Sequence, residues 1–148
     1  MDLHLKGKKV FISGSTKGIG FETARLFLEE GATVIINGRT KKSVESALSS
    51  LNSDNVSGLV ADFLKDSQVK TLIDHIPNDI DILVNNVGIF RGKEFKDETV
   101  DDWNDHFKVN LMSGVQLSKH FLPEMIKRNW GRIIFISSEC ATLVPSDL

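Results

Sequence analysis

A glycine-rich segment near the N-terminus has the residue types and spacing of a phosphate-binding loop. It joins an apolar run at 10–12, which predicts a strand, to a helical pattern over 18–30. Glycine permits tight turns and close approach of a ligand, and a helix N-terminus offers free N–H groups and a positive dipole end. We therefore predict that the loop binds a pyrophosphate. The candidate binding residues are Gly14, Ser15, Thr16, Lys17, Gly18, Ile19 and Gly20.

The next predicted strand, at 33–37, ends where the type of dinucleotide is selected. Proteins with this kind of loop place a carboxylate there to bind NAD, or a cation near the 2′-phosphate of NADP. Here Gly38, Arg39 and Thr40 follow the strand, with no acid. Arg39 can bind a phosphate through two N–H groups, and Lys17 can reach the same phosphate. We predict NADP in preference to NAD. The alternative is that both side chains are surface cations.

Elements that position these residues alternate along the chain. Apolar runs predict further strands at 56–60, 82–84 and 133–136. Helical periodicity predicts a helix capped by Thr40 and ending near Leu51, one at 66–76, and a long one at about 100–128 that can break near Asn110. Thr99 and Asp102 resemble a capping box. The alternation predicts an α/β fold, a doubly wound parallel sheet with strand order 3-2-1-4-5, in a single dinucleotide-binding domain over 1–148.

Composition narrows the possible partners. The 148 residues carry a net charge of −2, so no basic field attracts nucleic acid. A single cysteine, Cys140, excludes an internal disulfide, and the four histidines have no metal-ligand spacing. No signal-peptide pattern or apolar run of roughly 20 residues is present. We therefore expect a cytoplasmic protein without a metal, nucleic-acid or membrane partner.

Taken in order, the motifs resemble those of the short-chain dehydrogenases/reductases, over essentially the whole chain. The glycine loop resembles Thr-Gly-x-x-x-Gly-Ile-Gly, with Ser13 in place of Thr. Residues 85–88 resemble Asn-Asn-Ala-Gly, with Val87 in place of Ala. The resemblance implies a Rossmann fold in which Asn85 and Gly88 lie along the cofactor, while Asp62, beside Phe63, meets the adenine.

The same resemblance implies an enzyme and its chemistry. Ser138 matches the family's catalytic serine, and Asn110 matches the asparagine that holds a water in its proton relay. The implied reaction is hydride transfer between a nicotinamide and a small carbonyl or alcohol substrate. Members are usually dimers or tetramers, so a homo-oligomer is expected.

One departure from the family pattern is large. A Tyr-x-x-x-Lys motif should follow Ser138 closely, yet the sequence has no tyrosine. The strand at 133–136 is also apolar on both faces, although it would be a sheet edge, which proteins usually protect. We therefore expect the domain to be incomplete at its C-terminus, with further elements after Leu148, and these residues to be inactive alone.

Two other readings compete with this one. A naturally short, non-enzymatic cofactor-binding protein predicts a stop codon directly after Leu148. A methyltransferase with a similar sheet is disfavoured by Gly38 and Arg39, since such enzymes usually carry an acid at that strand end.

Overall fold

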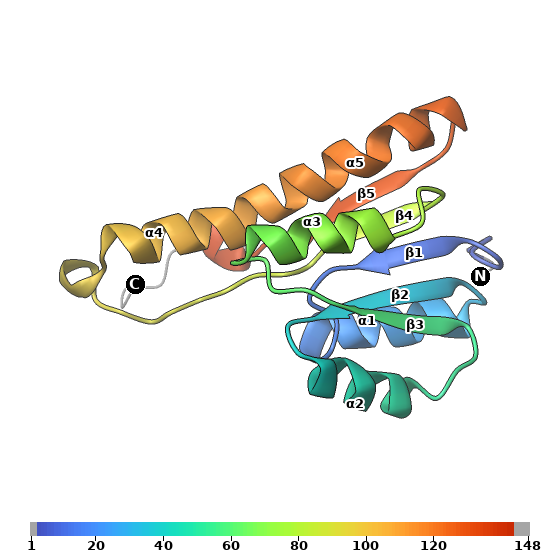
Figure 1. Cartoon of the computed structure of the whole chain (residues 1–148), viewed down its shortest axis with the longest axis horizontal. Helices are drawn as coiled ribbons and strands as arrows, with labels where there is room; N and C mark the ends of the chain where they lie inside the picture. The colour runs from blue at the N-terminus through green and yellow to red at the C-terminus, as the bar shows by residue number, and fades with distance from the viewer. Residues whose placement is uncertain (1–2, 144–148) are drawn as a thin grey trace.

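The structure, a computed structural model, describes residues 3–143 and contains a five-stranded parallel sheet. The strand order is β3-β2-β1-β4-β5, as predicted (Figure 1). The strands are β1 (Lys9–Ile12), β2 (Thr33–Gly38), β3 (Val56–Val60), β4 (Ile82–Asn85) and β5 (Arg132–Phe135). The order reverses direction between β1 and β4, and open α/β sheets bind their ligands at such a reversal, beyond the carboxyl ends of the strands.

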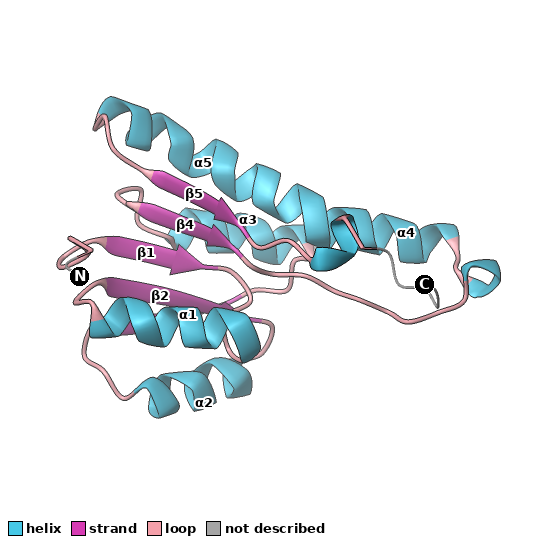
Figure 2. Ribbon diagram, turned by 180° about the vertical axis from the view of Figure 1, so that it is seen from behind, coloured by secondary structure: helices cyan, strands magenta, loops and turns pink. Residues whose placement is uncertain are grey.

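Helices cover both faces of the sheet (Figures 1 and 2). They are α1 (Gly18–Glu29), α2 (Lys41–Leu51), α3 (Asp66–His75), α4 (Val100–His106) and α5 (Ser113–Lys127). Helices α1 and α2 pack on one face, and α3 and α5 on the other. Short 3-10 turns lie at η1 (Phe95–Asp97) and η3 (Glu139–Ala141). Gly31, with a φ of 79°, lies directly after the C-cap of α1 and ends the helix.

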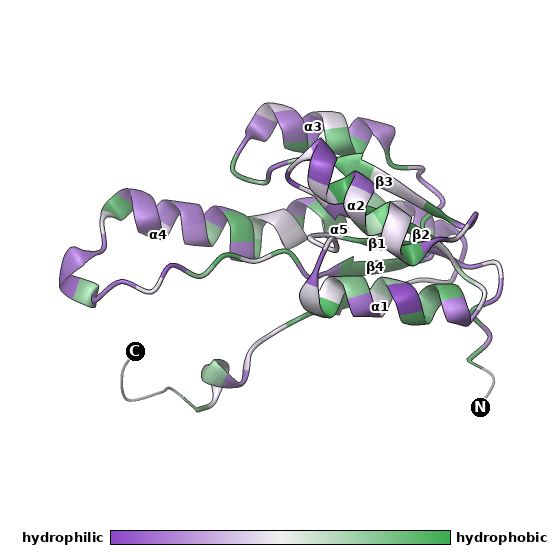
Figure 3. Ribbon diagram, turned by 90° about the horizontal axis from the view of Figure 1, so that it is seen from below, coloured by the Kyte–Doolittle hydropathy of each residue, from purple (hydrophilic) through white to green (hydrophobic). Residues whose placement is uncertain are grey.

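Successive side chains of each strand point to opposite faces of the sheet, so the core is divided into two layers. Phe11, paired in register with Ile35, points toward α3 and α5 and packs near Phe121. Val10 and Ile12 point to the other face, toward α1 and α2. Each of the central strands is therefore apolar on both sides. Figure 3 shows β1 and β4 lying between α3 and α1. The two layers hold the loops at the carboxyl ends of the strands in place.

The long helix predicted over 100–128 is a continuous column of three parts. Helix α4 passes into a π-helix, η2 (Phe107–Met112), and then into α5. The break expected near Asn110 is therefore a local widening of the helix, a feature often found at functional sites. The predicted capping box is confirmed, because Thr99 and Asp102 bond each other's backbone N–H groups.

Within the described residues, β5 is the edge of the sheet beyond β4. Its apolar side chains are poorly covered, and Ile134, Phe135 and Ile136 are all exposed. The sequence-based expectation of an apolar edge strand is confirmed, with its bounds shifted by one residue toward the N-terminus.

Candidate functional site: a cofactor cavity

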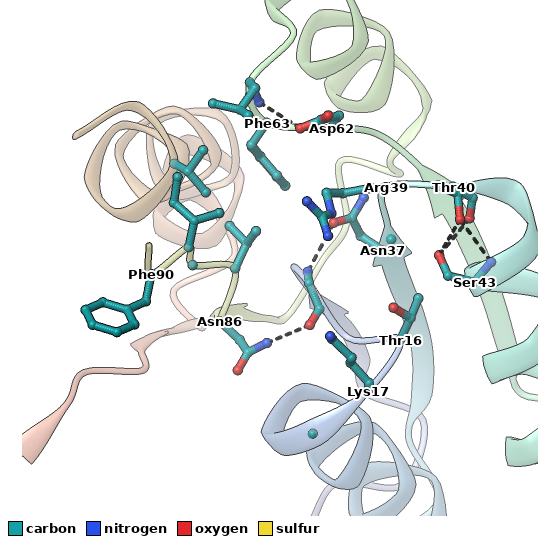
Figure 4. A pocket seen from close by; sticks show the side chains of 18 of the residues that line it. Thr16, Lys17, Asn37, Arg39, Thr40, Ser43, Asp62, Phe63, Asn86 and Phe90 are labelled. Atoms are coloured by element: carbon teal, nitrogen blue, oxygen red, sulfur yellow. Dashed lines mark hydrogen bonds between the residues drawn. The ribbon is translucent and has the colours of Figure 1, made fainter. Parts of the chain in front are cut away.

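A cavity of about 710 Å³ lies at the carboxyl ends of β1, β2 and β4, at the reversal of strand order (Figure 4). Its walls come from the glycine loop, the end of β2, the turn after β3 and the loop after β4. They include Gly14, Thr16, Lys17, Gly18, Asn37, Gly38, Arg39, Thr40, Ser43, Asp62, Phe63, Asn86, Gly88, Phe90 and Arg91.

The glycine loop forms the floor of the cavity with backbone that only glycine adopts easily. Gly14 has a φ of 61°, and a Cβ there would lie 2.9 Å from the Cα atom of Val87. Gly18 has a φ of 59° with open space beside it, at the start of α1. No side chain caps that helix start, where Gly18 lines the cavity, so the first N–H groups of the helix have no side-chain partner and can bind an anion.

The loop is tied to β4 by polar side chains. Asn86 donates from Nδ2 to the carbonyl oxygens of Ser13, at 3.0 Å, and Gly14, at 2.8 Å. The hydroxyl of Ser13 accepts from the N–H groups of Asn86 and Val87, each at 3.0 Å. A Cβ at Gly20 would lie 2.4 Å from Asn86 Nδ2, so the third glycine makes room for this asparagine. Serine in place of threonine at position 13 keeps the hydroxyl that these contacts need.

Asn37, near the end of β2, is buried, and its side chain links the glycine loop after β1 to β3 and the turn after β3. Its Oδ1 accepts from the N–H of Gly14 at 3.1 Å, and its Nδ2 donates to the carbonyls of Leu59 and Ala61, both at 3.3 Å. Asn37 is 1% exposed, so these hydrogen bonds take the place of bonds to water. They hold the glycine loop at a fixed position relative to the sheet.

Two cations flank the cavity. Lys17 and Arg39 are exposed, and within residues 3–143 neither forms an ion pair. Thr40 and Ser43 lie beside Arg39 at the start of α2, where Thr40 Oγ1 accepts from the Ser43 N–H at 3.1 Å (Figure 4). Unpaired cations beside the hydroxyls and N–H groups at the start of a helix suit a phosphate.

The turn after β3 closes another side. Asp62 accepts from the N–H of Leu64 through Oδ1 at 3.0 Å, and the Asp62 N–H donates to Gln68 at 2.9 Å. Phe63 is buried in the core and also lines the cavity. A carboxylate and an aromatic ring at one end of the cavity offer an acceptor and an apolar surface to a flat ring system.

The predicted cofactor residues fall into two groups in the structure. Those that line the cavity are Gly14, Thr16, Lys17, Gly18, Arg39, Asp62, Phe63 and Gly88. Those that do not line it are Ser15, Ile19, Gly20 and Asn85. The hydroxyl of Ser15 is buried and instead donates to the Ile12 carbonyl at 2.7 Å and accepts from the Asn37 N–H at 3.0 Å. The Asn85 side chain is buried beside Ser118.

The predicted catalytic residues lie outside the cavity wall. Asn110, on η2, holds the loop after β4: its Nδ2 donates to the Ile89 carbonyl at 2.9 Å, and its Oδ1 accepts from the Ile89 N–H at 2.7 Å. Ser138 is exposed beyond β5, and its hydroxyl accepts from the Cys140 N–H at 3.2 Å. Their catalytic roles stay predictions.

Sequence reasoning missed several residues of the site. The sequence pattern identifies Thr40 only as a helix cap and gives Ser43 no role, although a Thr-x-x-Ser pattern directly after a strand end is a visible signal. The pattern identifies Asn37 only as the last residue of a strand. Phe90 and Arg91 belong to no recognisable motif, and only the path of the loop brings them to the cavity.

Across residues 3–143, no group of His, Cys, Asp and Glu side chains is arranged to hold a metal ion. In the same residues, no helix combines the length and apolar character needed to cross a membrane.

The fold and the cavity together define a doubly wound α/β protein with a cavity at the reversal of its strand order, and comparison with known proteins gives the family. A model of the short chain dehydrogenase family matches residues 8–146. The chain therefore belongs to the short chain dehydrogenase family.

Individual relatives agree with this assignment. The uncharacterised oxidoreductase YvrD of Bacillus subtilis is 46% identical over 153 residues, which cover 98% of this chain and 58% of that protein. The 3-oxoacyl-[acyl-carrier-protein] reductase FabG of Aquifex aeolicus is 36% identical over 144 residues, which cover 93% of this chain and 58% of that protein. A gluconate 5-dehydrogenase from Burkholderia cenocepacia, solved in complex with NADP and tartrate, matches with a TM-score of 0.82 and 32% identity, over 95% of this chain and 57% of that one. The present chain thus spans under two thirds of the length of these relatives.

Proposed function

We propose that these residues form the NADP-binding part of an oxidoreductase that acts on a carbonyl or alcohol. One observation carries the cofactor assignment: unpaired Lys17 and Arg39 flank a cavity whose floor is the glycine loop, with no carboxylate at the end of β2. In this proposal the pyrophosphate lies over the start of α1, and the 2′-phosphate lies between the two cations, within reach of Thr40 and Ser43. The adenine lies toward Asp62.

Titration of the chain with NADPH, NADH and S-adenosylmethionine tests the assignment. We expect NADPH to bind most tightly. Each charge-assisted contact to the phosphate is worth about 1.5–3 kcal/mol, so Lys17→Ala with Arg39→Asp should abolish at least a roughly tenfold preference for NADPH over NADH. Lys42→Ala, an exposed cation outside the cavity, is the matched control. An unchanged preference in the double variant would refute NADP selection, and no binding of either dinucleotide would refute the function.

The substrate class rests on the relatives. Their names describe a 3-oxoacyl reductase and a 5-keto-D-gluconate reductase, both of which act on a keto group. The nicotinamide supplies or accepts the hydride. We propose that Ser138 donates a hydrogen bond to the substrate oxygen and that Asn110 holds a water that relays protons. Because the residues contain no tyrosine, they lack the phenol that the family uses as acid and base, and we propose that they turn over no substrate alone.

An NADPH oxidation assay on the 148-residue chain with a panel of ketones checks this point. We expect no turnover, even at cofactor concentrations that saturate binding. Oxidation at the rate of an active relative would contradict the proposal that the reaction needs a tyrosine as acid and base.

We also propose that the chain self-associates through the column of α4, η2 and α5. Exposed apolar side chains recur there at a spacing of three or four residues, so they share a face. They are Val100, Trp103, Phe107, Leu111 and Val115. Sedimentation velocity should show a dimer or tetramer that Trp103→Glu with Phe107→Glu dissociates. A wild-type monomer at high concentration would contradict the proposal.

A further inference from the structure

The loop between β4 and α4 is fastened to one helical column at two places. Near its start, Asn110 of η2 bonds both backbone groups of Ile89. Farther along, Asp102 of α4 bonds the side chains of Arg91 and Lys93. Figures 1 and 2 show this loop running alongside α4. The segment between the two fastenings forms one wall of the cavity.

Asp102, the third residue of α4, has more partners than its capping box with Thr99 requires. Its Oδ2 accepts from Lys93 Nζ at 2.6 Å, and from the N–H and hydroxyl of Thr99 at 3.0 and 2.7 Å. Its Oδ1 accepts from Arg91 at 3.3 Å, and the other guanidinium nitrogen of Arg91 lies 2.8 Å from Asp105. The hydrogen bond from Lys93, followed by those from Thr99, holds the pKa of Asp102 well below its usual range. The carboxylate is only 8% exposed, so these partners take the place of water.

Capping of α4 needs only the contacts with Thr99. The additional partners are two cations of the loop, and a surface loop would otherwise leave both in water. Forming these ion pairs costs conformational freedom of the two side chains and fixes the position of the loop. A binding wall that is ordered before the ligand arrives requires such a fixed loop.

This wall lies across the cavity from the end of β2 and the start of α2. Figure 4 places Phe90 across the cavity from Arg39, Thr40 and Ser43. If the 2′-phosphate binds at Arg39 and the pyrophosphate over the glycine loop, as proposed above, the nicotinamide half of the dinucleotide would extend toward Phe90.

We propose that Asp102 is a positioning residue that fixes the wall formed by Ile89, Phe90 and Arg91 and so strengthens binding of the nicotinamide half of the cofactor. The inference rests on the proposed dinucleotide function. A wall that is ordered before binding loses less conformational freedom when the ligand arrives. The adenosine half, which contacts other walls, gains nothing from it.

Calorimetric titration of the chain with NADP⁺ and with 2′,5′-ADP, which lacks the nicotinamide half, separates the two ends. Asp102→Asn keeps the size of the side chain and removes its charge. We expect it to weaken NADP⁺ binding by about fivefold or more and 2′,5′-ADP binding by less than about twofold. Asp101→Asn, an exposed acid in the same helical turn, is the matched control and should change neither.

Lys93→Ala provides a second variant that leaves the cap of α4 intact, so it tests the fastening even if Asp102→Asn does not fold. The variant removes the ion pair between Lys93 and Asp102 by changing the loop residue, and Lys93 does not line the cavity. We expect NADP⁺ to bind about twofold to threefold more weakly, with 2′,5′-ADP unchanged. Equal weakening of both ligands, or of neither, in the folded variants would overturn the positioning role. If the wild type binds neither ligand, the dinucleotide function itself is overturned.

Discussion

Replacing Gly38 with alanine tests how tightly the end of β2 fits the glycine loop. A Cβ at this position would lie 2.4 Å from Thr16 Cγ2 and 3.0 Å from both Ser43 Oγ and Val44 Cγ2. Non-bonded carbon atoms prefer separations of about 3.5–4.0 Å, so Thr16 must move or the strand must shift.

The cost follows from two opposing effects. Overpacking of a closely packed site costs about 1–3 kcal/mol. The φ of Gly38 lies outside the left-handed region, so alanine also regains about 0.4–1 kcal/mol by restricting the unfolded chain. The net loss of unfolding free energy is about 1–2 kcal/mol, which lowers the Tm of a chain of this size by roughly 2–8 °C.

Thermal unfolding followed by circular dichroism measures this effect. Thr16→Ser removes the clashing methyl group and keeps the hydroxyl, so the double variant with Gly38→Ala should regain most of the lost stability. Gly92→Ala is the matched control, since its Cβ would meet nothing closer than 3.6 Å. A Gly38→Ala variant that melts at or above the wild-type temperature would refute the steric reasoning, as would a failure of Thr16→Ser to restore stability.

The same fit bears on cofactor choice. A carboxylate at the end of β2 is what NAD binding requires, and Thr16 stands against any side chain there. We therefore expect Gly38→Asp to improve the ratio of NADH to NADPH affinity more in the Thr16→Ser background than alone. An equal improvement in both backgrounds would show that Thr16 is not a barrier.

Three further predictions concern stability. Phe121→Ala, which truncates a fully buried ring, should cost about 3–5 kcal/mol in urea unfolding; a cost below about 1 kcal/mol would show that this core layer does not carry the fold. Asn37→Leu leaves the Gly14 N–H and two backbone carbonyls without a hydrogen-bond partner, so we expect the free energy of unfolding to fall by about 2–4 kcal/mol and dinucleotide binding to weaken. Unchanged stability would show that water replaces the hydrogen bonds of Asn37. The pKa of Asp102 is lowered by its bond from Lys93, so its stabilising effect is present above the unfolded pKa, near 3.9, and is lost as pH falls below it. Unfolding curves of wild type and Asp102→Asn should therefore converge in acid, and a constant difference down to pH about 2 would contradict this origin.

Local patterns in the sequence were sufficient for the architecture. Alternating apolar runs and helical periods predicted each strand and its place in the sheet, because parallel strands need apolar residues on both faces. The glycine spacing predicted the loop, and the pair Thr99 and Asp102 predicted a helix start, because both signals depend on residues only a few positions apart. The ends of elements shifted by a residue or two, as fraying helix and strand ends do.

The sequence by itself therefore determined the fold class, the family and the place of the glycine loop between the first strand and the first helix. Tertiary structure alone decided which side chains face the cavity. In the folded chain, Ser15 points inward and bonds the Ile12 carbonyl, and Asn37 accepts from the Gly14 N–H. Asp102 bonds Lys93 in the loop after β4. Those contacts join strands and loops far apart in the chain, so their partners follow from the path of the backbone rather than from any local spacing of residues.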